Sequence, residues 1–365
     1  MIKLASVFSG IGAVEHALER LKNEKDIDYE IVFACDNGER ELSKSIDEIE
    51  DTIKELDYEE KKSYINELYE QTKKPNYVKM SYFENYDIDE NEWYEDIRFI
   101  DGSKYQGKVN LLVGGSPCQS FSNMGKRKGL VDERGILVFQ FIRLINEIQP
   151  NVFIFENVPG MLSHNKGRTW EKIKDKFDSL DYDIHIDILN SKDYGIPQDR
   201  RRLFVVGFKK KVENFKFPEK QELNTKLSDF LEDKVDYIHY LGRKGFEFVT
   251  NPNNSNRARI NSEIMKTQKA NQQYNWNGDF IFEKYDPNKH DKKIKKRAYL
   301  GEYEGEQGVV RQLTNRECLR LMGFSDNFNI VVPRMQAYRQ AGNSIVVNVL
   351  QELMKSILEV VDFNE

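Results

Sequence analysis

The chain has 365 residues, of which 39% are hydrophobic and 12% aromatic, enough for one large hydrophobic core or two smaller ones. Its formal net charge of −6 argues against indiscriminate binding of nucleic acids, and its 3 scattered cysteines exclude a disulfide framework and a recognisable zinc site, so we expect no metal ion. No stretch approaches about 18 uninterrupted apolar residues, and Met1 to Leu4 lead directly into an apparent strand. We therefore expect a cytoplasmic protein without a membrane partner.

Short apolar runs alternate with helical patterns along the chain. This alternation predicts the α/β class, with a mostly parallel sheet wrapped by helices. The runs are Lys3 to Phe8, Ile31 to Cys35, Val109 to Val113, Val152 to Phe155, Ile184 to Leu189 and Leu203 to Phe208.

The first run ends in a glycine-containing turn, Phe8 to Gly12, ahead of a helical stretch. Glycines there let backbone amides approach a ligand at a helix N-terminus, although such a turn alone is common. Asp36 ends the second run, where a carboxylate can accept hydrogen bonds from both hydroxyls of a ribose. Together the two features favour a nucleoside-binding Rossmann half.

Residues 39–90 have the pattern of a charged helical insertion. Leu42, Ile46, Ile49, Ile53 and Leu56 recur at steps of four and three, which predicts one or two amphipathic helices within residues 39–72. The wider segment 38–98 carries 19 Asp and Glu against 9 Lys and Arg, and we interpret it as a solvated acidic face.

The third run leads to Cys118, which lies in a turn with Gly114, Gly115 and Pro117. Proline fixes one backbone angle beside the cysteine, and loops at the carboxyl ends of strands carry the chemistry of open α/β sheets. The residues alone are compatible with a nucleophile and with a buried core thiol at this position. For Cys35 and Cys318 a core thiol is the simpler interpretation.

Charged groups flank two later runs. Glu156 ends the fourth run, at the same expected sheet edge as Cys118, where it suits either a general acid toward a heterocycle or a helix N-cap. Arg200 and Arg202 precede the sixth run and would share one strand face, opposite Arg201. Such a pair can clamp a phosphate or steady a carbonyl, although three arginines there are also typical of solvent exposure.

From Lys209 to about Val310 the periodic pattern fails, which predicts a second, irregular domain. Within it, residues 241–297 carry 13 Lys and Arg against 6 Asp and Glu, a balance suited to phosphates or to a solvated face. Helical patterns return from Leu313 to Met322 and from Ile345 to Val361, and we expect this C-terminal part to pack back onto the first domain.

Several short motifs occur together and in order, and on them the chain resembles the DNA (cytosine-5) methyltransferases. They are Pro117-Cys118-Gln119, Glu156-Asn157-Val158, Gln198-x-Arg200-x-Arg202 and Ala341-Gly342-Asn343-Ser344. The resemblance spans about residues 3–37, 96–208 and 311–361. It implies a Rossmann-like, S-adenosylmethionine-dependent catalytic domain over residues 1–208, with the insertion 39–90, a target-recognition domain over residues 209–310 and a C-terminal segment over residues 311–365.

The resemblance also implies the roles of the site residues. Cys118 would be the nucleophile that adds to C6 of cytosine, and Glu156 would hold N3 and the exocyclic amine. Arg202 would contact the base carbonyl and help position the cysteine, with Arg200 in the same catalytic group. The cofactor S-adenosylmethionine would be bound by Phe8, Ser9, Gly10, Gly12, Asp36, Asp96 and Asn343.

We therefore expect sequence-specific methylation of C5 of a cytosine rotated out of double-stranded DNA, through a covalent cysteine–C6 adduct. The expected protein is a monomer of a restriction-modification system, paired in function with a restriction endonuclease but forming no stable complex with it. Two alternatives stay open: an RNA (tRNA) cytosine-5 methyltransferase of the same fold, and a catalytically inactive DNA-binding relative. A generic Rossmann dehydrogenase would explain only the glycine turn and Asp36.

Overall fold

The structure is a computed structural model that describes residues 1–25, 27–117, 133–271 and 276–364. The chain divides into two compact units. Unit 1 comprises Met1–Leu189, Arg201–Glu219 and Leu350–Glu365, and unit 2 comprises Asn190–Arg200 and Lys220–Val349. This division follows internal contacts alone, so the functional boundaries expected near residues 208 and 310 stay a prediction.

A seven-stranded sheet with the strand order β3-β2-β1-β4-β5-β8-β6 forms the centre of unit 1. Strands β1 to β5 run parallel to their neighbours, whereas β8 pairs with β5 in the antiparallel direction. The α/β class and the mostly parallel sheet are thus confirmed, with every predicted strand present. The strands are β1 (Ile2–Val7), β2 (Tyr29–Cys35), β3 (Trp93–Tyr94), β4 (Leu111–Gly114), β5 (Val152–Asn157), β6 (Asp183–Asn190) and β8 (Arg201–Phe208).

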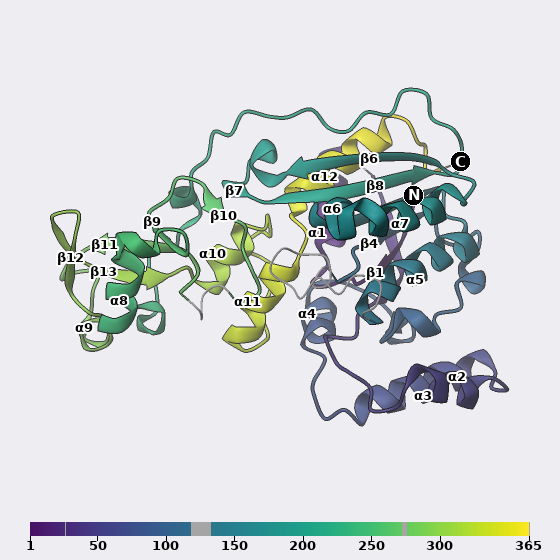
Figure 1. Ribbon diagram of the computed structural model, residues 1–365, viewed down its shortest axis with the longest axis horizontal. Helices are drawn as coiled ribbons and strands as arrows, with labels where there is room; N and C mark the ends of the chain where they lie inside the picture. The colour runs from purple at the N-terminus through teal and green to yellow at the C-terminus, as the bar shows by residue number, and fades with distance from the viewer. Residues whose placement is uncertain (26, 118–132, 272–275, 365) are drawn as a thin grey trace. The chain divides into compact units, whose positions relative to one another are not determined.

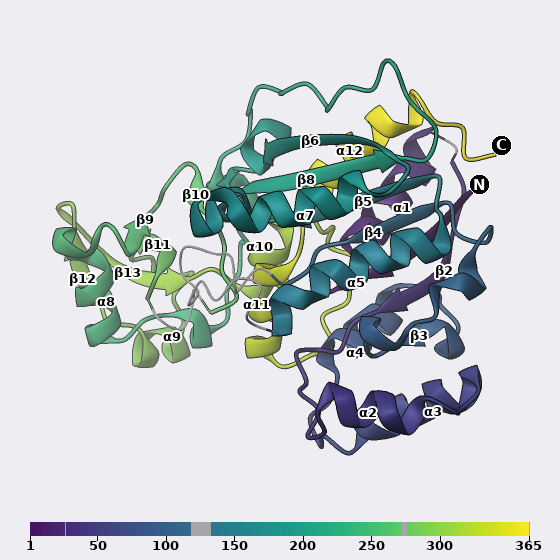
Figure 2. The same cartoon turned by 45° about the vertical axis from the view of Figure 1, so that its right-hand side comes forward.

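Helices cover both faces of this sheet, which explains why its central strands are apolar throughout. Helices α5 (Glu133–Ile148) and α7 (Arg168–Asp178) lie on one face, where the ring of Phe153 stacks on that of Phe177 with the centroids 5.6 Å apart. Helix α1 (Ala13–Lys25) and helix α12 (Val347–Leu358) lie behind the sheet in Figure 2, and a hydrogen bond of 3.2 Å joins Arg20 to Gln351.

The insertion forms three helices, α2 (Ile46–Ile53), α3 (Tyr58–Glu70) and α4 (Tyr77–Asn85). The predicted helices within residues 39–72 are confirmed as α2 and α3, each of which begins with a capping box. These two helices lie side by side in Figures 1 and 2 and share an apolar cluster. Helix α4 lies within the predicted helical insertion but was not predicted as a separate helix, because its apolar residues do not gather on one face.

Unit 2 holds a four-stranded sheet with the order β12-β13-β11-β9 and a two-stranded sheet of β10 and β7. The segment that the sequence indicates as irregular contributes most of the strands of these two sheets, and these strands are short and contain charged residues. The strands are β7 (Gln198–Asp199), β9 (Ala258–Ile260), β10 (Met265–Lys266), β11 (Gly278–Lys284), β12 (Gly301–Tyr303) and β13 (Glu306–Gln312). The helices are α8 (Arg243–Thr250), α9 (Lys292–Arg297), α10 (Asn315–Arg320) and α11 (Arg334–Asn343).

Candidate active site at the carboxyl edge of the sheet

Most predicted site residues of unit 1 gather at one edge of its sheet. Because β1, β2, β4 and β5 are parallel, their carboxyl ends face the same edge. Strand β8 is antiparallel, and it therefore brings its first residues to that edge, where Leu203 pairs with Asn157. Strands β2 and β3 lie on one side of β1, and β4 lies on its other side, so the order of the strands reverses at β1. Open α/β sheets bind ligands at such a switch point.

The turn after β1 adopts a backbone that suits ligand contact. Phe8, Gly10 and Gly12 have positive φ angles of 54°, 56° and 76°. For Phe8, which is not a glycine, this conformation costs on the order of 1 to 3 kcal/mol, and such strain is concentrated at functional sites. Ser9 ties the turn to β2, because its amide donates to the Cys35 carbonyl at 3.1 Å.

Asp36 follows β2 and faces this turn. Its Oδ2 accepts a hydrogen bond from the Gly10 amide at 3.0 Å, and its Oδ1 accepts one from the Gly38 amide at 2.8 Å. Burial raises the pKa of Asp36 to about 6, and the two amide donors oppose that rise. Each carboxylate oxygen has two acceptor positions, so Asp36 can accept further hydrogen bonds from a ligand.

Phe8 to Gly12 together with Asp36 form a cradle that fits an adenosine group. Among the described residues, a Cβ built on Gly10 would meet only the Phe8 carbonyl oxygen, at 4.0 Å, so the space beside this backbone is open. The Asp36 carboxylate offers acceptors to ribose hydroxyls, whereas Phe8 packs partly buried against the core of unit 1, so its contact with a base stays a prediction. The cradle therefore has the chemistry expected for the nucleoside part of the cofactor.

Asp96 has other partners. Its carboxylate accepts hydrogen bonds from the Tyr69 hydroxyl at 2.7 Å and from the guanidinium of Arg98 at 2.6 and 2.9 Å. These donors compete with the cofactor contact that the family resemblance implies, so this role of Asp96 stays a prediction.

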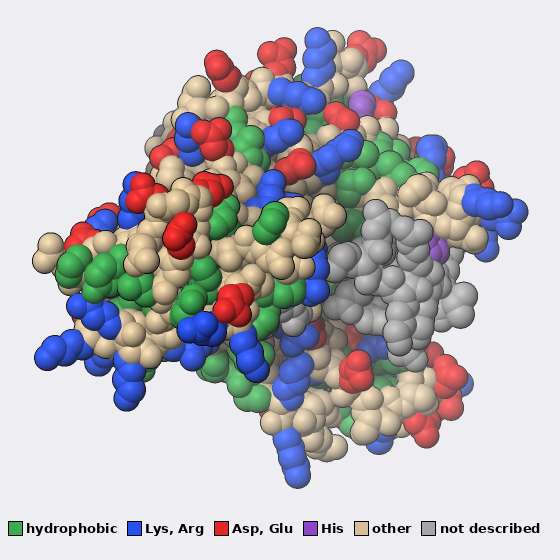
Figure 3. Space-filling view, turned by 60° about the vertical axis from the view of Figure 1, so that its left-hand side comes forward, with side chains coloured by type: hydrophobic (Ala, Val, Ile, Leu, Met, Phe, Trp, Pro, Cys, Tyr) green, Lys and Arg blue, Asp and Glu red, His purple; other side chains and the backbone are tan. Residues whose placement is uncertain are grey.

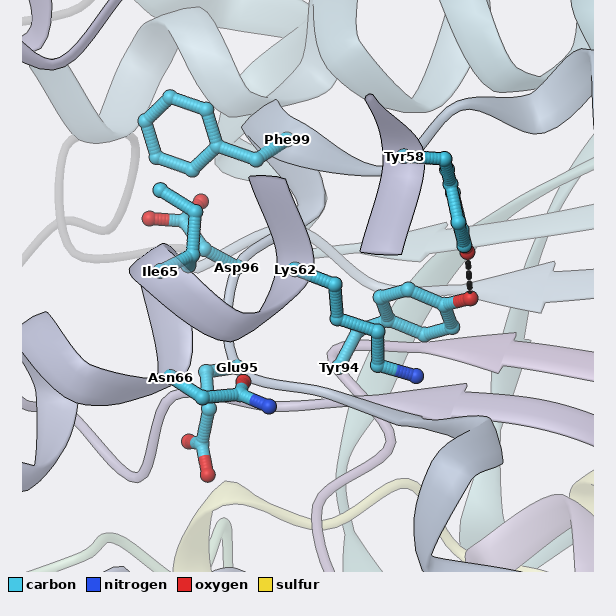
Figure 4. Close-up of a pocket in the computed structure, with 8 residues that line it drawn as sticks. All are labelled: Tyr58, Lys62, Ile65, Asn66, Tyr94, Glu95, Asp96 and Phe99. Atoms are coloured by element: carbon cyan, nitrogen blue, oxygen red, sulfur yellow. Dashed lines mark hydrogen bonds between the residues drawn. The ribbon is translucent and has the colours of Figure 1, made fainter. Parts of the chain in front are cut away.

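Asp96 also borders a small cavity under helix α3 (Figure 4). The cavity encloses about 10 Å³, which is room for about one water molecule. On its opposite side the hydroxyls of Tyr58 and Tyr94 form a hydrogen bond, and the Lys62 ammonium lies 3.9 Å from the centre of the Tyr94 ring. A pocket of this size does not admit a cofactor, and its aromatic and ionic contacts fix α3 to the sheet.

Glu156 and Arg202 form an ion pair at the same edge. Arg202 Nε lies 3.0 Å from Glu156 Oε1, and the two side chains are 15% and 12% exposed. Gly115, in the turn after β4, makes room for the carboxylate, since a Cβ there would lie 2.9 Å from Glu156 Oε2. A carboxyl and a guanidinium held together in this way can contact a ring nitrogen and the carbonyl next to it.

Asn157 is a site residue whose role the sequence did not suggest. Its Nδ2 donates to the Ser116 carbonyl at 3.1 Å and to the Ser116 hydroxyl at 3.0 Å, which fixes the turn that leads to Cys118. Cys118 itself lies outside the described residues. The sequence offered one signal for this role, which is an asparagine side chain directly after Glu156 at the end of a strand. The backbone of a neighbouring loop at this edge needs a hydrogen-bonding partner, and such a side chain can supply it.

Arg200 and Asn343 belong to unit 2. The sequence predicted that Arg200 and Arg202 share a strand face. This prediction is wrong, because strand β8 begins at Arg201. Arg200 is 3% exposed, and its guanidinium donates to the carbonyls of Gln268 at 2.8 Å and Ser344 at 2.7 Å. Asn343 ends α11 directly before Ser344, so Arg200 holds the turn in which Asn343 lies.

Unit 2 also contains the basic segment. Helix α9 is lysine-rich, with Lys295, Lys296 and Arg297 in its last turn. Figure 3 shows Lys and Arg side chains along the lower left of the surface, with fewer acidic side chains among them. A contact of such a surface with phosphates stays a prediction.

In the described part of the chain, no helix has both the length and the apolar character needed to cross a membrane. No group of three or more His, Cys, Asp or Glu side chains is placed to hold a metal ion within these residues.

Comparison with known proteins gives a consistent result. Residues 65–359 match the family described as C-5 cytosine-specific DNA methylase. The chain is 34% identical over 266 residues to the type II methyltransferase M.DsaV of Dactylococcopsis salina, covering 70% of each chain. It is 34% identical over 256 residues to the type II methyltransferase M.HhaI of Haemophilus parahaemolyticus, covering 68% of this chain and 75% of the relative.

Solved structures agree on the fold. The methyltransferase EhMeth of Entamoeba histolytica superposes with a TM-score of 0.68 at 18% identity, covering 98% of each chain. The Dnmt2 methyltransferase of S. pombe superposes with a TM-score of 0.63 at 19% identity, covering 98% of this chain and 99% of the other. At this identity the likeness concerns the fold alone. The family match and the two curated relatives show that the chain belongs to the C-5 cytosine-specific DNA methylase family, as a DNA (cytosine-5) methyltransferase.

Proposed function

We propose that this chain transfers a methyl group from S-adenosylmethionine to C5 of a specific cytosine in duplex DNA, and that it protects host DNA in a restriction-modification system. The family match and the names of the type II relatives support this role and favour neither the RNA substrate nor an inactive relative. The observation that carries the proposal is the Glu156–Arg202 pair, which lies against Gly115 in the turn leading to Cys118.

Each of these groups has a part in activating the base. C5 of cytosine is an unreactive aromatic carbon until the Cys118 thiolate forms a bond to C6, which turns the ring into an enamine with a nucleophilic C5. As that bond forms, negative charge moves onto N3 and the carbonyl oxygen. Glu156, which must take up a proton before this step, donates that proton to N3, and the Arg202 guanidinium stabilises the carbonyl oxygen.

The remaining groups hold the cofactor and complete the turnover. S-adenosylmethionine, when bound, supplies the electrophilic methyl group for C5. Phe8, the backbone of Ser9, Gly10 and Gly12, and the Asp36 carboxylate would hold its adenosine and methionine parts. After methylation the C5 proton passes to a base, its electron pair restores the C5–C6 double bond, Cys118 leaves as a thiolate, and N3 returns its proton to Glu156.

The cytosine must leave the helix for this chemistry, since C5 and C6 are stacked inside duplex DNA. Unstacking costs about a few kcal/mol, which contacts to DNA must offset. We assign these contacts to the target-recognition domain, residues 209–310, whose basic segment 241–297 suits phosphates while its loops read base edges in the major groove. The enzyme acts as a monomer, beside an endonuclease that it does not stably bind.

A methylation map tests the proposal. The chain and its Cys118→Ser variant are expressed in a host without cytosine methylation, and genomic DNA and total RNA are both converted with bisulfite and sequenced. The proposal predicts 5-methylcytosine at one short recurrent DNA sequence, and none with the variant. Methylation confined to RNA, or an unmethylated genome from folded protein, would contradict it.

A further inference from the structure

The insertion, residues 39–90, contacts three loops that surround the cradle. The loops follow β1, β2 and β3, and all three belong to unit 1, as the insertion does. Helix α4 lies nearer to the sheet than α2 and α3 in Figures 1 and 2, and Asn76 and Tyr86 at its two ends contact the loops after β2 and β1.

Tyr86, directly after α4, holds the turn after β1. Its hydroxyl donates to the carbonyl oxygens of Gly12 at 2.7 Å and Ile11 at 3.2 Å. A Cβ on Gly12 would lie 2.1 Å from the Tyr86 ring, so the ring occupies the space that any other side chain there would need. Tyr82, one helical turn earlier, donates to the buried Glu15 carboxylate at 2.6 Å. The main chain of the glycine turn is therefore clamped from the side of α4.

Asn76, the N-cap of α4, holds the loop after β2. Its Nδ2 donates to the Asp36 carbonyl at 2.8 Å and to Glu95 Oε2 at 2.9 Å, while its Oδ1 accepts from the Lys79 amide at 3.0 Å. A Cβ on Gly38 would lie 2.3 Å from Asn76 Oδ1, so the loop and the Asn76 side chain are in close contact. One amide group thus joins the helix cap, the loop after β2 and the residue after β3.

The loop after β3 is held from the other end of the insertion. Glu95 forms a buried ion pair with Arg40. Arg40 also donates to the Tyr69 carbonyl at 3.1 Å, and the Tyr69 hydroxyl donates to Asp96 at 2.7 Å. All three loops are therefore bonded to side chains that lie outside the cradle.

We propose that the insertion is a brace that sets the affinity of the cradle for S-adenosylmethionine, with Asn76 and Tyr86 as positioning residues. This inference rests on the proposed function, because it concerns the site where that cofactor would bind. Turns with several positive φ angles are entropically expensive to order, and a ligand binds more tightly when the protein has ordered them beforehand. Asn76 and Tyr86 bond to the main chain of these turns, so they act through the turns and not on the ligand.

Two conservative variants of the full chain test the brace. Asn76→Asp keeps the acceptor for the Lys79 amide but removes the donor to Asp36 and Glu95, and Tyr86→Phe keeps the ring over Gly12 but removes the hydroxyl. Asn91→Asp, at an exposed position, makes the same charge change, and Tyr64→Phe removes a hydroxyl bonded to Lys44 at 2.8 Å. The dissociation constant of S-adenosylhomocysteine is measured by calorimetry for every protein, together with the unfolding temperature, KM and kcat.

Loss of the hydrogen-bond donor should weaken S-adenosylhomocysteine binding by about tenfold in each brace variant. KM for S-adenosylmethionine should rise by a similar factor, while kcat and both control variants stay within about twofold of wild type. If Tyr86→Phe binds S-adenosylhomocysteine as tightly as Tyr64→Phe does, the brace is overturned and the proposed function stays intact. The comparison of these two variants tests the brace even if Asn76→Asp does not fold. Wild-type protein that binds no S-adenosylhomocysteine would overturn the proposed function, and this inference with it.

Discussion

Replacing Glu156 by glutamine tests the site most sharply, because the amide keeps the size of the side chain and removes its charge and acidity. The variant breaks the ion pair with Arg202, whose atoms are 3.0 Å apart. Two unit charges at that distance attract by about 5 kcal/mol at an effective dielectric constant near 20. Desolvation offsets most of this attraction, and a hydrogen bond to a charged group contributes a net of about 1.5 to 3 kcal/mol.

We therefore expect Glu156→Gln to lower the free energy of unfolding by about 2 kcal/mol, which a typical protein with roughly 5 to 15 kcal/mol of stability survives. Its kcat should fall far more, by about 100-fold to 10,000-fold, because a positioned general acid contributes on that scale. Urea unfolding gives the first quantity, and single-turnover methyl transfer to a saturating duplex gives the second.

Glu147→Gln is the matched control. Glu147 pairs with Arg143 at 2.7 Å in the last turn of α5, which leads to the amino end of β5, at the opposite edge of the sheet. This variant should lose less stability than Glu156→Gln, because its pair is more exposed, and its kcat should stay within about twofold of wild type. A folded Glu156→Gln protein whose kcat matches that of Glu147→Gln would refute the assigned role of Glu156.

Three further predictions follow from single contacts. Because the pKa of Asp36 is raised to about 6, its protonation below that pH should weaken S-adenosylhomocysteine binding by up to about tenfold per pH unit, and calorimetry should find this dependence absent in Asp36→Asn. Gly115→Ala brings a Cβ to within 2.9 Å of Glu156 Oε2 and should reduce kcat by at least about tenfold, and an unchanged kcat would contradict the close contact. Arg311→Met leaves Glu317 buried without its partner at 2.8 Å and should lower the free energy of unfolding by about 3 to 5 kcal/mol in urea, and a loss below about 1 kcal/mol would contradict the buried ion pair.

The sequence predicted the sheet of unit 1 because parallel strands buried on both faces are continuous apolar runs. It did not predict the antiparallel direction of β8, since a run of apolar residues carries no direction. That direction matters for the site, because it places Arg202 at the carboxyl edge beside Glu156.

The rest of the site could not be predicted, because it depends on tertiary contacts that the hydrophobic periodicity of the sequence does not encode. Arg200 was grouped with Arg202 because residues two positions apart share a face on an ideal strand. In the structure β7 ends at Asp199 and pairs with β10. Arg200 therefore belongs to unit 2, and its guanidinium donates to the Gln268 carbonyl there. The acidic insertion was interpreted as a solvated face, yet buried Asn76 and Arg40 reach from it to the loops after β2 and β3.

The central claim is that Cys118 attacks cytosine C6 while Glu156 and Arg202 hold the base. The most direct measurement uses a duplex that carries the mapped site with 5-fluorocytosine at the target position, incubated with S-adenosylmethionine. Fluorine at C5 does not leave as a proton does, so the methylated adduct should stay bonded to the enzyme and survive denaturation, with peptide mass spectrometry assigning the bond to Cys118. Methylation of the ordinary duplex with no trapped adduct, or an adduct on another residue, would contradict the account.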